Sequence, residues 1–75
     1  MTTKEFLLEL QNILQLDEPL TPTSDLSDDS WDSMAQMAVL AFFGKAFGHT
    51  ISMEDIYSVD NVSDLLEIAK PYIKD

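Results

Sequence analysis

The stretch "SWDSMAQM", residues 30–37, joins a polar segment to an apolar run, and the interpretation of the chain depends on it. Serine and aspartate both suit the N-cap of a helix, because a side-chain oxygen there accepts a hydrogen bond from a free backbone N–H group. Asp32 and Ser33 therefore predict that a helix begins here. Its apolar residues continue to about Phe47, and Gly48 is its expected end.

A first helix is predicted at the start of the chain. Thr2 or Thr3 can cap it, and Glu5 lies at the spacing of a capping box with Thr2. We expect it to end near Gln15 or Leu16, because two prolines follow closely. The apolar residues that recur at helical spacing within it are Phe6, Leu7, Leu10, Ile13 and Leu14.

Residues 17–30 are rich in Pro, Thr, Ser and Asp, which predicts a long loop between the first and second helices. We expect Leu20 and Leu26 to anchor this loop in the core, and Trp31 to do the same at its end. Long loops in compact domains tend to be functional. This one leads directly to Ser33.

Beyond Gly48, residues 49–52 are expected to be extended or irregular. Ser52 can cap a short helix from Met53 to Tyr57, and Asn61 can open a last helix that Pro71 ends or kinks. No segment has a convincing strand pattern. We therefore expect an all-α fold, a small helical bundle of three main helices plus one short helix, forming a single domain over residues 1–75.

The charge of the chain is strongly negative: fourteen Asp and Glu face four Lys and no Arg, for a net charge of −10. This charge disfavours nucleic acids and anionic membranes as partners. Basic protein surfaces fit better, although a solvated acidic coat without a partner explains the charge equally well. With no cysteine, the chain has no disulfide and no thiolate metal site.

The apolar run from Met37 to Phe43 is too short to span a bilayer, and the N-terminus lacks the apolar core of a signal peptide. We expect a cytoplasmic protein without membrane insertion, present as a monomer.

Ser33 lacks the partners of a catalytic nucleophile. His49 is the only histidine, and it follows Ser33 by about four helical turns, too far to activate the hydroxyl along that helix. We therefore expect no enzymatic activity. Ser33 can instead be a passive acceptor, since a helix N-terminus favours an anion. Asp28, Asp29 and Asp32 oppose an anion, but they suit a divalent cation that a modifying enzyme brings. We expect no metal site in the chain itself.

Asp32-Ser33-Met34, at the start of a helix after a long loop, resembles the Asp-Ser-Leu motif of acyl carrier proteins. The resemblance extends over most of the chain, through Phe47-Gly48, Thr50-Ile51, Glu54-Asp55-Ile56 and the segment "VDNVSDLLEIA" at residues 59–69. It implies that Ser33 is the attachment site of 4′-phosphopantetheine, taken from coenzyme A, and that Asp32 helps the transferase to recognise it. The missing cysteine is then explained, because the reactive thiol arrives with the cofactor.

The resemblance also implies partners: a phosphopantetheinyl transferase, an acyl- or aminoacyl-loading ligase, and the synthases and acyltransferases of one pathway. Acyl carrier proteins usually display several acids on the second helix, whereas this chain has none between Asp32 and Glu54. A helix that is apolar on nearly all sides is buried or part of an interface. We therefore expect apolar contact with a partner, in a specialised lipid, polyketide or related pathway, through Met34, Met37, Ala38, Ala41 and Lys45, with Phe42 at the edge.

Two further expectations concern the same helix. The alternative to an exposed face is that the long loop folds over Met34, Met37 and Phe42. The opposite side of the helix, with Val39, Leu40, Phe43 and Phe47, should face the core. An acyl chain can then enter between the second and third main helices, lined by Val39, Phe43, Ile51, Ile56, Leu65 and Ala69.

Two other functions stay open from the sequence. The first is an aminoacyl carrier, of the D-alanyl type or of nonribosomal peptide pathways, which resembles the chain around "DSM". The second is a small acidic helical interaction module without a prosthetic group. In that module Ser33 is only a helix cap, and Asp32 is only a favourable charge at the helix start.

Overall fold

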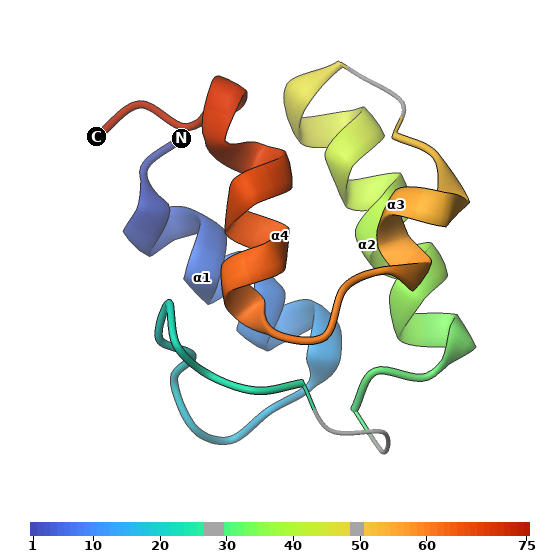
Figure 1. Cartoon of the computed structure of the whole chain (residues 1–75). Coiled ribbons are helices and arrows are strands. Elements are labelled where there is room, and N and C mark those ends of the chain that lie inside the picture. Colours follow the sequence, from blue (N-terminus) through green and yellow to red (C-terminus); the bar gives the residue numbers. More distant parts are fainter. Residues whose placement is uncertain (27–29, 49–50) are drawn as a thin grey trace.

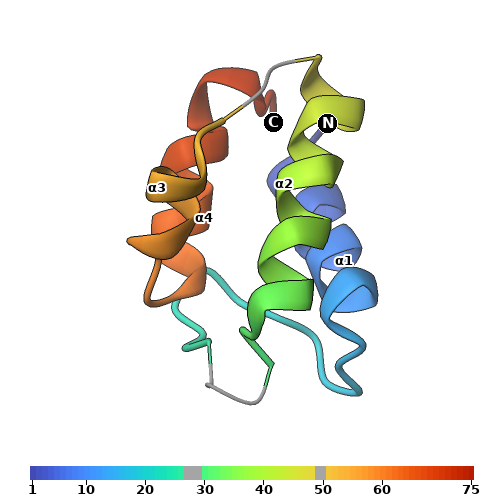
Figure 2. The same ribbon diagram turned by 90° about the vertical axis from the view of Figure 1, so that its right-hand side faces the viewer.

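The computed structural model describes residues 1–26, 30–48 and 51–75. Its helices are α1 (Thr3–Leu14), α2 (Ser33–Phe47), α3 (Met53–Tyr57) and α4 (Val62–Ala69), followed by a 3-10 turn, η1 (Lys70–Tyr72). In Figure 2, α1 and α2 lie on one side of the bundle and α3 and α4 on the other. The described residues contain no strand, only an isolated bridge between Asp25 and Asn61. The prediction of three main helices plus a short one is confirmed.

Side-chain caps fix where the helices begin. Thr2 and Glu5 form the predicted capping box, in which the Glu5 N–H donates to Thr2 Oγ1 (3.2 Å) and the Thr2 N–H donates to Glu5 Oε1 (2.9 Å). Ser52 and Asn61 accept from the backbone N–H of the residue three positions later, at 3.2 Å and 3.0 Å. Each of these caps was predicted at the residue that forms it.

Two helices end in left-handed backbone. Gly48 has φ +68° after α2, a conformation that glycine adopts without steric cost. Gln15 has φ +56° after α1, so this helix also ends where the sequence predicted.

Aromatic side chains hold α1 against α2. Phe6 is fully buried, and its ring centroid lies 5.8 Å from that of Phe43 and 5.9 Å from that of Phe42. The sequence placed Phe42 at the edge of the exposed side of α2, and Phe42 is half-buried there, with its ring against that of Phe6. Phe47, half-buried, also packs against Phe43, at 5.4 Å. The fully buried residues of the core cluster are Phe6, Leu10, Val39, Phe43, Ile56, Leu65 and Ala69.

The long loop crosses one end of the bundle, from the end of α1 to the start of α2 (Figure 1). Leu20 and Leu26 are half-buried and pack against the core, as predicted. The Val62 N–H donates to the Ser24 carbonyl at 2.9 Å, which attaches the loop to the start of α4. Residues 27–29 and 49–50 lie outside the described residues, and with them Asp28, Asp29, His49 and part of the segment expected to be extended.

The first and last described residues meet at the other end of the bundle (Figure 1). The Lys74 N–H donates to the Met1 carbonyl at 2.9 Å. The Asp75 carboxylate accepts from the Thr3 N–H at 2.8 Å and from the Thr3 hydroxyl at 2.7 Å. Nearby, the rings of Phe47 and Tyr72 stack with centroids 5.2 Å apart.

The contact between Thr3 and Asp75 should make stability depend on pH. Hydrogen bonds from the Thr3 hydroxyl and N–H hold the pKa of the Asp75 carboxyl below its usual range. A lowered pKa in the folded state stabilises the fold above the unfolded-state pKa of about 4, and this stabilisation is lost as the pH falls through the folded-state pKa. We expect Asp75→Asn to lower the melting temperature at neutral pH and to have a smaller effect at about pH 2.

Asp60→Asn is the control for the change in net charge, since the Asp60 side chain accepts no hydrogen bond from the described residues. Melting followed by circular dichroism at both pH values tests the prediction. Equal melting temperatures for the two variants at neutral pH would contradict it.

Candidate functional site

Asp32, not Ser33, is the N-cap of α2. Asp32 Oδ1 accepts from the Ala35 N–H at 2.8 Å, and the Asp32 carbonyl accepts from the Gln36 N–H at 3.0 Å. Ser33 is the first helical residue and is exposed. The interpretation of Ser33 as a cap is therefore wrong, because the preceding carboxylate already occupies that position. The Ser33 hydroxyl is left at the surface, at the positive end of a fifteen-residue helix.

The residues before Asp32 anchor the start of the helix. Trp31 is half-buried and packs against the core, as predicted. Its carbonyl accepts a long hydrogen bond from Gln36 Nε2 at 3.4 Å. Its indole Nε1 is buried and has no hydrogen-bond partner among the described residues. The bulky ring thus ties the end of the loop to the core just before Ser33.

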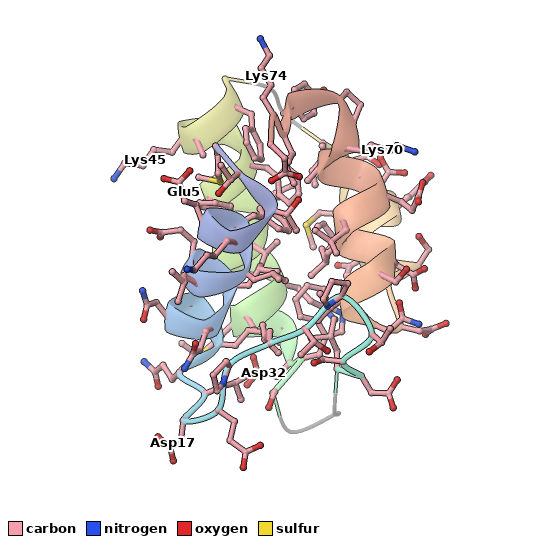
Figure 3. All side chains as sticks on the ribbon, turned by 90° about the vertical axis from the view of Figure 1, so that its left-hand side faces the viewer. Glu5, Asp17, Asp32, Lys45, Lys70 and Lys74 are labelled. Carbon is pink, nitrogen blue, oxygen red and sulfur yellow. The ribbon has the colours of Figure 1, made fainter. Side chains whose placement is uncertain are left out.

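An open pocket of about 510 Å³, called here the α1–α2 pocket, lies between the end of α1 and the first half of α2. Asp32 and Met34, the two neighbours of Ser33 in the chain, both line it. Figure 3 shows Asp32 and Asp17 at this end of the bundle, whereas Lys70 and Lys74 lie at the other. Its lining is formed by Ile13, Leu14, Gln15, Leu16, Ser30, Asp32, Met34, Ala35 and Ala38.

Sequence reasoning missed the contribution of α1 to this pocket. The sequence predicted that Ile13 and Leu14 lie on the apolar face of the first helix. It predicted that the helix ends near Gln15 or Leu16. Their place beside Ser33 follows from the way the long loop folds back, which helical periodicity does not encode.

The outer face of α2 is defined by Met34, Met37, Ala38, Ala41 and Lys45, and all five are exposed. The exposed fraction is 81% for Met34 and 64% for Met37. The alternative in which the loop covers these two methionines is therefore wrong. Since α2 has no acidic residue, this face is apolar apart from one lysine.

The structure brings the expected acyl-chain residues together. Five of them are fully buried in one cluster, and Ile51 packs at its edge. Their role as a chain lining stays a prediction. The five fully buried residues are Val39, Phe43, Ile56, Leu65 and Ala69.

Comparison with known families identifies the chain. The family model described as "Phosphopantetheine attachment site" matches residues 5–68. The chain belongs to this family, the domain family of the acyl carrier proteins. Its members carry covalently attached 4′-phosphopantetheine, so this chain is a phosphopantetheine-dependent carrier protein. No curated protein and no solved structure matches the chain.

The family membership bears on activity and partners. Carrier domains of this family are not catalytic, and they interact with phosphopantetheinyl transferases and with the enzymes of their pathway. No helix in the described part of the chain is long and apolar enough to cross a membrane. Within the same residues, no group of three or more His, Asp or Glu side chains is placed to hold a metal ion.

The residues at the start of α2 fit the prosthetic group. The exposed Ser33 hydroxyl provides an accessible oxygen, and the adjoining α1–α2 pocket provides apolar and polar surface beside it. When attached, the group supplies a thiol, which the chain lacks because it has no cysteine.

The capping geometry leads to a test that separates Asp32 from Ser33. We expect Asp32→Ala to lower the free energy of unfolding by about 0.5–2 kcal/mol, because the Ala35 N–H loses its acceptor. Ser33→Ala should change it by less than about 0.5 kcal/mol, since no cap is lost. Urea denaturation of the unmodified proteins measures both, and a larger loss for Ser33→Ala would contradict the assignment.

Proposed function

We propose that Ser33 holds the 4′-phosphopantetheine arm through a phosphodiester and that the chain carries acyl intermediates as thioesters on its thiol. The observation that carries this proposal is the exposed hydroxyl of Ser33 at the first position of α2, directly after Asp32 and within the family match. In the transfer, the Ser33 oxygen forms a bond to the phosphorus that bears the pantetheine. Adenosine 3′,5′-bisphosphate leaves coenzyme A, and the transferase takes the hydroxyl proton.

The electrostatics of the site support a transfer that needs an external enzyme. The N-terminus of α2 favours the new phosphate, whereas the exposed Asp32 carboxylate disfavours it. A Mg²⁺ ion of the transferase can shield both anions. We assign to Asp32 the recognition role that its place in the motif implies.

The outer face of α2 is our proposed contact surface for the transferase and for the pathway enzymes. An exposed apolar patch commonly marks an interaction site, and methionine repacks readily against different partners. Enzymes that recognise acidic residues on this helix have none to bind here. This supports a dedicated ligase or synthase in a specialised lipid, polyketide or related pathway. Lys45, at the far end of the face, would contact an acid of the partner.

The size of the outer face favours transient contacts. From Met34 to Lys45 the helix rises about 16 Å, so a strip about 10 Å wide covers on the order of 200 Å². A stable interface buries about 800 Å² on each partner. A permanent dimer through this face alone is therefore disfavoured, which agrees with a monomer that visits several enzymes.

Modification of Ser33 is tested by the intact mass of the protein. After incubation with coenzyme A, Mg²⁺ and a broad-specificity phosphopantetheinyl transferase, we expect one phosphopantetheine adduct on the parent and none on Ser33→Ala. Ser63→Ala is the matched control, because Ser63 is an exposed serine in the first turn of α4. This control should be modified like the parent. Absence of an adduct on the parent with several transferases would contradict the proposal.

The contact surface is tested by a charge placed on it. We expect Met37→Glu to lower kcat/KM of the transferase for the protein about tenfold, equivalent to about 1.4 kcal/mol, because the carboxylate must be desolvated in the complex. Leu8→Glu is the control, an equally drastic change at a half-exposed leucine of α1. Equal rates for Met37→Glu and the parent, or equal losses in both variants, would refute this surface.

A further inference from the structure

The α1–α2 pocket lies where a group attached to Ser33 must pass. Asp32 and Met34 line the pocket on either side of Ser33 in the sequence, so an arm on its oxygen starts beside the opening. The volume of about 510 Å³ lies within the range of small-molecule sites in proteins. The lining also combines apolar side chains with a few polar groups, as such sites do.

The end of α1 offers hydrogen-bond acceptors to this pocket. The last four carbonyls of a helix have no partner within it. The Gln11 carbonyl accepts from the Leu16 N–H at 3.0 Å and the Asn12 carbonyl from the Gln15 N–H at 3.2 Å. The carbonyls of Ile13 and Leu14 accept from no donor in the described residues, and both residues line the pocket. Two lining residues of the pocket thus have backbone carbonyls that no donor of the described residues occupies.

The pantetheine part of the arm has matching chemistry. It is uncharged, with two amide N–H donors, a geminal dimethyl group and a thiol. The two donors match the two carbonyls at the end of α1. The dimethyl group matches the apolar lining that Ile13, Leu16, Met34 and Ala38 provide. The side-chain amide of Gln15, also in the lining, offers a further donor and acceptor.

The charge of the pocket decides which part of the arm enters. Asp32 is the only charged residue of the lining. Its carboxylate repels the phosphodiester, which therefore stays at the opening, while the neutral pantetheine meets no such repulsion. The other side of α2 is less accessible to the arm. Val39, Phe43 and Ile56 are fully packed there, so a bound arm would have to displace them.

We propose that the pantetheine arm of the modified protein rests in the α1–α2 pocket, with its amides donating to the carbonyls of Ile13 and Leu14. This inference rests on the proposed attachment at Ser33 and adds a binding site for the arm on the side of α2 that faces α1. The pocket shelters the arm between visits to enzymes.

The experiment uses protein labelled with ¹³C and ¹⁵N and modified with an unlabelled arm, and isotope-filtered NMR detects contacts between the two. We expect nuclear Overhauser effects from the geminal dimethyl protons to the methyl groups of Ile13, Leu16 and Ala38. Ala38→Phe fills the pocket and should abolish these effects at Ile13 and Leu16. Ala41→Phe is the matched control, because Ala41 lies on the same exposed face outside the pocket lining, and there they should persist.

The outcomes separate this inference from the proposed function. The intact mass of each sample first reports whether the arm is present. An arm on Ser33 without contacts to Ile13 or Leu16, or with contacts to Ile56 instead, overturns the pocket alone. Loss of the contacts in both variants overturns it as well. A parent protein that no transferase modifies overturns the attachment and the pocket together.

Discussion

The packing of Phe6 against the phenylalanines of α2 is the contact on which the rest of the structure depends. Phe6 is fully buried and lies within 6.3 Å of three rings of α2, measured between centroids. A chain of 75 residues can bury only a small hydrophobic core, and aromatic side chains bury the most area per residue. This contact holds the start of α1 against the last turns of α2. Because the two helices run antiparallel (Figure 2), the end of α1 then lies beside the start of α2, where the pocket next to Ser33 is found.

Much of the fold could be predicted because its signals are local. Thr2, Ser52 and Asn61 each cap a helix through an atom only three residues away from its donor. The interpretation of Ser33 as an N-cap was wrong because Asp32 and Ser33 both suit that position, and only the backbone path decides between them. The contact between Phe6 and Phe42 was not predicted, because the two residues lie far apart in the sequence and a helical wheel describes only one helix.

The candidate site likewise has one part that local sequence signals predict and another that depends on residues far apart in the sequence. Ser33 and the outer face of α2 belong to one continuous segment, so their motif and spacing were visible in the sequence. The α1 side of the pocket comes from a segment separated from α2 by the long loop. The backbone carbonyls that we propose as acceptors there are present in every residue, so the sequence does not single them out. The α1 side of the pocket therefore follows only from the three-dimensional packing of the helices.

The first and last described residues lie at the end of the bundle remote from the start of α2, where Ser33 is (Figures 1 and 2). Hydrogen bonds from Lys74 to Met1 and from Thr3 to Asp75 hold these outer residues together. A surface, dye or fusion partner joined to either of these residues is therefore attached at that end of the bundle. Ser33 then lies at the far end of α2 from the attachment.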